Sequence, residues 1–91
     1  MEMIKYLSIL LSNEVNLSTS ASGGLIRLAI KDETGPFKPL KQLDLKDYID
    51  VCENALKERL KKLNVKRVDQ IIERLVSELT KNQSLITMEK V

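Results

Sequence analysis

Apolar residues near the N-terminus recur with the spacing of an amphipathic helix. At about 3.6 residues per turn, residues 2–12 place their large apolar side chains on one broad face and polar side chains on the opposite stripe. We therefore predict a helix over 2–12. Its apolar face contains Met3, Ile4, Tyr6, Leu7, Leu10 and Leu11.

The next segment, residues 14–31, is open to two interpretations. Two stretches, EVNLST and LIRLAIK, alternate between apolar and polar residues, and the small residues SASGG lie between them. Alternation on both sides of a glycine-containing turn is typical of a β-hairpin. The alternative is a helix that begins near Ser22, but two glycines in its first turn would weaken it by up to about 1 kcal/mol each. We therefore expect the hairpin.

Residues 32–43 interrupt the pattern and predict a linker within the domain. Gly35 and Pro36 break regular structure, and each proline biases the residue before it away from the helix. Phe37 is the only phenylalanine of the chain, and we expect it to pack against the core.

The longest apolar periodicity predicts a helix from Leu45 to Leu63. Asp44 is a suitable N-cap, and Asp47 adds a second acid near the positive end of the helix dipole. Leu43 and Tyr48 have the spacing of a hydrophobic staple. The apolar arc of this helix contains Leu45, Tyr48, Ile49, Cys52, Ala55, Leu56, Leu60 and Leu63.

A second helix follows Asn64, with an apolar seam at intervals of three and four residues. Together the two helices predict an αα-hairpin over 44–82, followed by a tail, 83–91, that is either a short strand or a packed extension. We thus predict a single domain, 1–91, of the α+β class and dominated by helices. Its parts are the N-terminal helix, the β-hairpin and the αα-hairpin. An all-α four-helix domain is the alternative.

Composition limits the chemistry that this small domain can perform. The chain of 91 residues has no histidine and a single cysteine, so the commonest general base is absent, and neither a disulfide framework nor a multi-cysteine zinc site is possible. We predict no catalytic, cofactor or metal site and expect a protein that is not an enzyme. A single thiol fits a reducing, cytoplasmic location. No apolar run approaches the length of a membrane span.

Positive charge is concentrated in LKERLKKLNVKR, residues 56–67, which holds six basic residues and one acid for a net charge of +5. Two lysines have a glutamate four positions earlier, in the pairs Glu53–Lys57 and Glu58–Lys62. Cations at the end of a helix also complement its dipole. Much of the charge in the first helix is therefore what an ordinary solvated helix would carry.

The remaining cations are harder to explain in this way. Lys66 and Arg67 begin the second helix, where the dipole disfavours positive charge. We expect Lys61, Lys62, Lys66 and Arg67 to meet at one solvent-facing tip. This tip is a solvated surface, a contact for a protein partner or a contact for nucleic-acid phosphates. No aromatic residue lies between 49 and 91, which disfavours stacking on single strands.

Two further residues lie within the apolar arc of the first hairpin helix. Arg59 either extends its charged end to solvent along the apolar surface or anchors a partner at an interface. Cys52 is expected to be a buried, inert thiol, because no histidine is present to activate it.

The leading functional hypothesis is a non-enzymatic protein–protein interaction module, which is an accessory subunit of a larger protein or a homodimer. The amphipathic first helix, the heptad-like seam and Arg59 on a small core motivate it. The alternative is a nucleic-acid-associated protein that contacts DNA phosphates through 56–67. No small-molecule substrate is evident.

The Lys-, Ile- and Leu-rich, thermophile-like composition and the helical stretch LKERLKKLNVKR resemble the small accessory subunits of archaeal information-processing complexes. Subunits that bind a replicative family-B DNA polymerase are an example. The resemblance implies a subunit that holds a polymerase and lies near DNA, so both hypotheses can be true together. It carries no site residues over to this chain.

Overall fold

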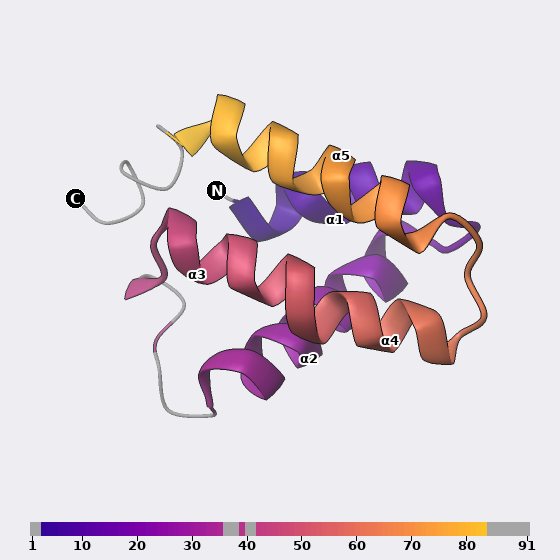
Figure 1. Ribbon diagram of the computed structural model, residues 1–91, viewed down its shortest axis with the longest axis horizontal. Coiled ribbons are helices and arrows are strands. Elements are labelled where there is room, and N and C mark those ends of the chain that lie inside the picture. The colour runs from indigo at the N-terminus through magenta and orange to yellow at the C-terminus, as the bar shows by residue number, and fades with distance from the viewer. Residues whose placement is uncertain (1–2, 36–38, 40–41, 84–91) are drawn as a thin grey trace.

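The computed structural model describes residues 3–35, 39 and 42–83, and within these residues it contains helices and no strand. Figure 1 shows a long central rod, made of α3 (Leu45–Asp50), η2 (Val51–Leu56) and α4 (Lys57–Lys62). The all-α alternative therefore fits, and the predicted α+β class with a β-hairpin is wrong. The predictions for Phe37 and for residues 84–91 of the tail concern residues outside the described part of the chain.

The other helices pack around the central rod. α2 (Thr19–Thr34) contacts η2 on one side, and α5 (Val68–Lys81) contacts α3, η2 and α4 on the other. α1 (Met3–Glu14) packs against both α2 and α5 (Figure 1). No helix of the described residues is both long enough and apolar enough to cross a bilayer.

α1 confirms the predicted N-terminal helix and ends two residues later than expected. Met3, Leu7 and Leu11 recur every four residues and are buried in the core. Two polar contacts then join α1 to α5. Tyr6 Oη donates a hydrogen bond to Glu78 Oε1 at 2.7 Å, and Glu14 forms a salt bridge of 2.9 Å with Arg74.

α2 replaces the predicted β-hairpin. Ser18 caps its start, since the Ser18 hydroxyl accepts a hydrogen bond of 3.0 Å from the Ala21 N–H. The large apolar residues Ile26, Leu28 and Ile30 alternate along the chain like those of a strand, but Leu28 is exposed and the small residue Ala29 is buried in its place. The buried positions have helical spacing. They are Ser22, Gly23, Ile26, Ala29 and Ile30.

Gly23 has a packing role at the contact between α1 and α2. A Cβ atom at Gly23 would lie 3.1 Å from Ser8 Oγ of α1, so only a residue without a side chain fits at this contact without adjustment. Within SASGG, Gly23 is thus the point at which α1 and α2 approach each other, with the buried Ser22 beside it. This segment is not a turn. α2 also continues into the predicted linker and ends at Thr34, before Gly35 with φ of 85°.

The helix predicted over 45–63 is confirmed, and it begins as the sequence indicates. Asp44 accepts a hydrogen bond from the Asp47 N–H at 2.9 Å, and the Asp47 carboxylate accepts one from the Asp44 N–H at 3.1 Å. This is a reciprocal capping box. Leu43 and Tyr48, the predicted staple, are both buried in the core.

The middle of the central rod is a π-helix, η2, which we did not predict. At its end the Lys57 N–H donates to Cys52 O, five residues back. Four buried side chains, Tyr48, Cys52, Leu56 and Leu60, recur at every fourth position. In an α-helix each such step advances by about 40° around the axis, so the row would leave the core. The wider π turn offsets this rotation.

α5 buries the predicted apolar seam against the core. Val68, Ile72, Leu75 and Leu79 are buried, together with Ile71. The central rod and α5 are therefore the two arms expected for 44–82, joined by residues 63–67.

Candidate functional site

The connection between α4 and α5 positions the predicted cations. α4 ends in a Schellman motif, in which Val65 N–H donates to Leu60 O at 3.1 Å and Asn64 N–H donates to Lys61 O at 3.0 Å. Asn64 takes the left-handed conformation that this motif requires, with φ of 60°. Asn64 thus ends the first helix, one of the two roles its position allowed.

The basic tip, defined as Lys61, Lys62, Lys66 and Arg67, lies at this connection (Figure 1). All four residues are exposed. Arg67 immediately precedes α5 with φ of 61°, a left-handed conformation that is uncommon for arginine. Its position at the positive end of α5 agrees with the expectation of a cation placed against the dipole.

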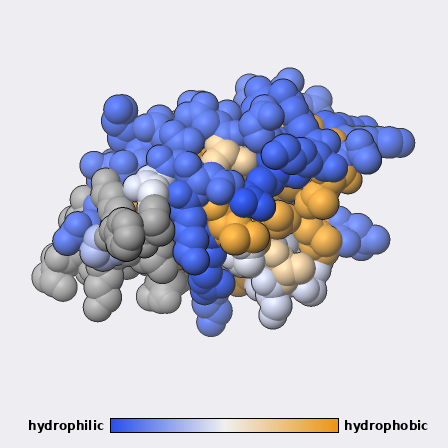
Figure 2. All heavy atoms as spheres, turned by 90° about the horizontal axis from the view of Figure 1, so that it is seen from below, coloured by the Kyte–Doolittle hydropathy of each residue, from blue (hydrophilic) through white to orange (hydrophobic). Residues whose placement is uncertain are grey.

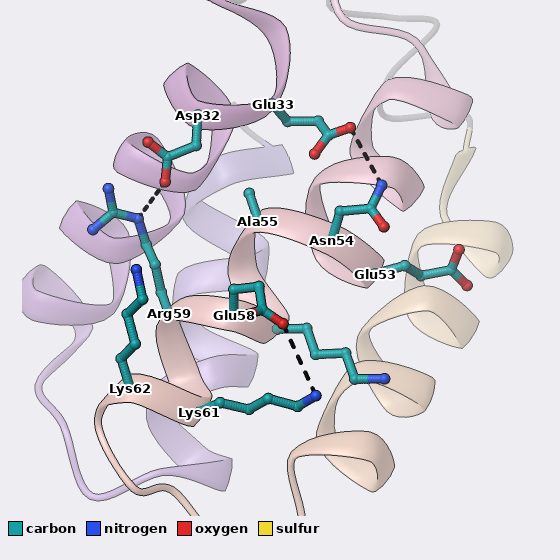
Figure 3. Close-up of a pocket in the computed structure, with 10 residues that line it drawn as sticks. Asp32, Glu33, Glu53, Asn54, Ala55, Glu58, Arg59, Lys61 and Lys62 are labelled. Atoms are coloured by element: carbon teal, nitrogen blue, oxygen red, sulfur yellow. Dashed lines mark hydrogen bonds and ion pairs between the residues drawn. The ribbon is translucent and has the colours of Figure 1, made fainter.

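The cations of the tip do not all point in one direction. Figure 3 shows Lys62 extending along the same side as Arg59 and Lys61 extending toward Glu58. Lys61 Nζ lies 3.9 Å from Glu58 Oε2, with both side chains largely exposed. Lys62, Lys66 and Arg67 form no salt bridge within the part of the chain that the structure describes. The tip is therefore a cationic end of the molecule and not a single focused patch.

Arg59 forms a salt bridge within the protein. Its Nε donates to Asp32 Oδ2 at 2.6 Å, and the two side chains retain exposed fractions of 31% and 46%. The hydrogen bond from Arg59 lowers the pKa of Asp32, and the same bond raises the pKa of Arg59. Arg59 joins α4 to α2, a role absent from both of our interpretations of this residue.

Asp69 and Glu58, two acids near the tip, also lie close to lysines of the protein. Lys57 Nζ lies 2.9 Å from Asp69 Oδ1 in the first turn of α5, and the hydrogen bond between them raises the Lys57 pKa and lowers the Asp69 pKa. We had expected Lys57 to pair with Glu53 and Lys62 with Glu58. In the structure the partner of Lys57 is Asp69, and Glu58 lies near Lys61.

A shallow groove of about 530 Å³ runs beside the central rod between η2, α4 and the end of α2. Figure 3 shows its charged and polar lining, in which Asn54 Nδ2 donates to Glu33 Oε2 at 3.3 Å. Sites for small molecules are mainly apolar with few polar groups, so this groove does not fit that class. The lining residues are Asp32, Glu33, Glu53, Asn54, Ala55, Lys57, Glu58, Arg59, Lys61 and Lys62.

Cys52 is a core residue, as expected. It is buried, and this burial raises the pKa of its thiol to about 12, with a smaller contribution from Glu53. The thiol is therefore protonated at neutral pH and is a poor nucleophile. Among the described residues no group of three or more potential ligands could hold a metal ion.

Two residues near the site were not identified from the sequence. Asp32 was assigned to a linker, and only the helical form of α2 brings it to Arg59, 27 positions later. Leu63 was assigned to the buried arc, but 53% of its surface is exposed at the C-cap of α4, where the connection begins. The available signal for Leu63 was its place directly before Asn64, a residue type that occurs in the left-handed position at helix ends.

Comparison of the chain with models of known protein families, with curated proteins and with solved structures finds no match. The site geometry must therefore support the functional argument alone.

Proposed function

We propose that this protein is a non-enzymatic binding module whose basic tip contacts the phosphates of duplex nucleic acid. One observation carries the proposal. Lys62, Lys66 and Arg67 form no salt bridge among the described residues, while the neighbouring acids Asp32 and Asp69 are each paired with another cation. Unpaired, exposed cations are available for phosphate groups without the loss of an internal ion pair.

The expected binding is electrostatic and weak. A duplex is favoured over a single strand, because no aromatic residue of the segment 49–91 is present to stack on bases. Contact by cations on flexible side chains positions the protein on the backbone and does not read sequence. We therefore expect affinity that is insensitive to sequence and falls as salt is raised.

The salt dependence of duplex binding tests this function. The three cations that form no salt bridge among the described residues predict a slope of log K against log salt of about −3. Changing Lys61, Lys62, Lys66 and Arg67 to glutamine should abolish binding while leaving the fold intact. Binding by this variant with the wild-type slope would remove the hypothesis.

A matched control separates the tip from net charge. Lys5, Arg27, Lys31 and Lys46 are also three lysines and one arginine, and all four are exposed outside the tip. Their replacement by glutamine changes the net charge equally and should leave most of the affinity. Equal loss in both variants would show that overall charge, and not the tip, is responsible.

A protein partner is the second candidate, and it is favoured by the outer side of α2. Figure 2 shows apolar residues gathered beside charged ones on one face of the molecule. Leu28 of α2 exposes 46% of its surface, and a Cβ atom at Gly24 would meet no neighbour. The apolar face of α1, the seam of α5 and Arg59 are used within the fold and do not supply a free surface for a partner.

An accessory subunit that contacts both a protein and DNA, as in archaeal polymerase complexes, remains a proposal on this basis. A cytoplasmic location is part of it, because a single free thiol fits a reducing compartment. Co-purification from the native host with and without nuclease tests the protein partner. A partner that survives nuclease and higher salt supports this candidate, and recovery of nuclease-sensitive material alone contradicts it.

A further inference from the structure

Leu63 is the most exposed of the large apolar side chains described, with 53% of its surface accessible. Along the chain it stands between Lys62 and Asn64, with Lys66 and Arg67 shortly after. A single exposed leucine is ordinary on a protein surface, but Leu63 stands along the chain within the basic tip, whose four cations are exposed. Leu63 is therefore an exposed apolar group of the tip that phosphate contacts do not use.

The backbone holds Leu63 firmly in this exposed position. The Leu63 N–H donates to both Arg59 O and Leu60 O at 3.2 Å, and the Schellman hydrogen bonds follow directly. Leu60 is fully buried, and Val65 packs against the core, so both sides of the turn are anchored. Presentation of an apolar side chain on an anchored turn reduces the entropy lost on binding.

We propose that Leu63 is an apolar wedge that enters the minor groove of duplex DNA and partly unstacks a base step. The inference rests on the proposed function and deepens it. Minor-groove proteins insert a leucine or a similar side chain between bases and flank it with Lys, Arg or Asn. Asn64 and the cations of the basic tip supply those flanking groups, and they complement the negative charge of the backbone.

An anionic membrane surface is the competing occupant, because it also combines negative charge with an apolar interior. Binding of that kind depends on a helix with a broad apolar face or on a lipid chain. The tip presents one leucine, whose burial would supply too little affinity for a lipid surface. A wedge between base pairs needs only one side chain, which favours DNA.

The test compares Leu63→Ser with Leu28→Ser, a matched change at a leucine of similar exposure on α2. The probe is a short DNA duplex with a central TA step, which unstacks readily, and with 2-aminopurine beside it to report unstacking. Leu63→Ser should weaken binding at least tenfold and abolish the fluorescence increase, with the salt slope unchanged. Leu28→Ser should match the wild type, and Lys66→Gln should reduce the slope by about 0.9.

The outcomes separate this inference from the proposed function. Equal affinity of wild type and Leu63→Ser would overturn the wedge, while loss of binding in the quadruple glutamine variant would keep the phosphate-binding function. No binding of the wild type to the duplex would overturn both. Leu63-dependent binding to phosphatidylserine vesicles, with no 2-aminopurine signal on the duplex, would reassign Leu63 to a lipid surface and overturn the wedge.

Discussion

The contact between α1 and α2 and the contact between the central rod and α5 are built from different side chains. α1 and α2 meet where Ser8 lies against Gly23, with the buried Ser22 beside it. The central rod and α5 bury large aliphatic residues such as Leu60 and Leu75. A contact between large apolar residues is visible in the sequence as a hydrophobic period, whereas a contact between small residues is not.

The largest loss of stability is expected from a substitution in the central rod. Leu60→Asp places an unpaired charge in the core, and we expect it to unfold a domain whose stability is on the order of 5–15 kcal/mol. Leu63→Asp, three residues later on the exposed connection, should change stability by less than about 0.5 kcal/mol. Circular dichroism during heating measures both. A folded Leu60→Asp variant would contradict the assigned burial.

The small-residue contact should break when its space is filled. Gly23→Leu forces a side chain against Ser8 and should destabilise the protein by about 1–3 kcal/mol, the usual cost of overpacking. The helix propensity of leucine offsets part of this loss. Urea denaturation gives the change in the free energy of unfolding. Unchanged stability would mean that α1 and α2 do not rely on close approach.

At the neighbouring Gly24 we expect a substitution to raise stability, the opposite of the effect at Gly23. A Cβ atom at Gly24 meets no atom within 4 Å, so Gly24→Ala gains helix propensity without a clash. We expect stabilisation by about 0.5–1 kcal/mol in the same urea experiment. A loss of stability at Gly24 would indicate that this part of α2 is not helical in solution.

These glycines also show how far the sequence could predict the fold. The first helix and both arms of 44–82 followed from periodicity, because each buries large apolar residues, and the Asp44 cap followed from the residue preference at helix starts. α2 was misassigned because two adjacent glycines lower helix propensity, and only Gly23 gains a close contact in return, with Ser8 of another helix. A local pattern does not record such a tertiary contact.

The site was predictable to a similar degree. Lys61, Lys62, Lys66 and Arg67 are close in sequence, so their placement at one end followed once the two helices were recognised. The engagement of Arg59 by Asp32 could not be predicted while α2 was read as a hairpin, because that contact requires the helix to reach Asp32. The exposure of Leu63 could not be predicted from the apolar period, because Leu63 is the C-cap residue at which α4 ends and the chain turns away.

The smallest effect concerns the polar contact that joins α1 to α5. The hydrogen bond from Tyr6 lowers the pKa of Glu78 below its ordinary 4.5, and the Glu78 carboxylate raises the pKa of Tyr6. A carboxyl with a lowered folded-state pKa contributes stability above its ordinary pKa and loses it as pH falls through the folded value. Tyr6→Phe should therefore lower Tm slightly at neutral pH, and the difference from wild type should shrink in acid.

Lys81 and Arg74 also face Glu78 and lower its pKa, so acid weakens more than one interaction there. Glu78→Gln is the discriminating control, because the amide oxygen can still accept the Tyr6 hydrogen bond but does not titrate. In the Glu78→Gln background the effect of Tyr6→Phe should no longer depend on pH between about 3 and 6, the range around the ordinary carboxyl pKa. A pH dependence that persists there would place the titrating group elsewhere, and α1 would then be held to α5 mainly by apolar contacts.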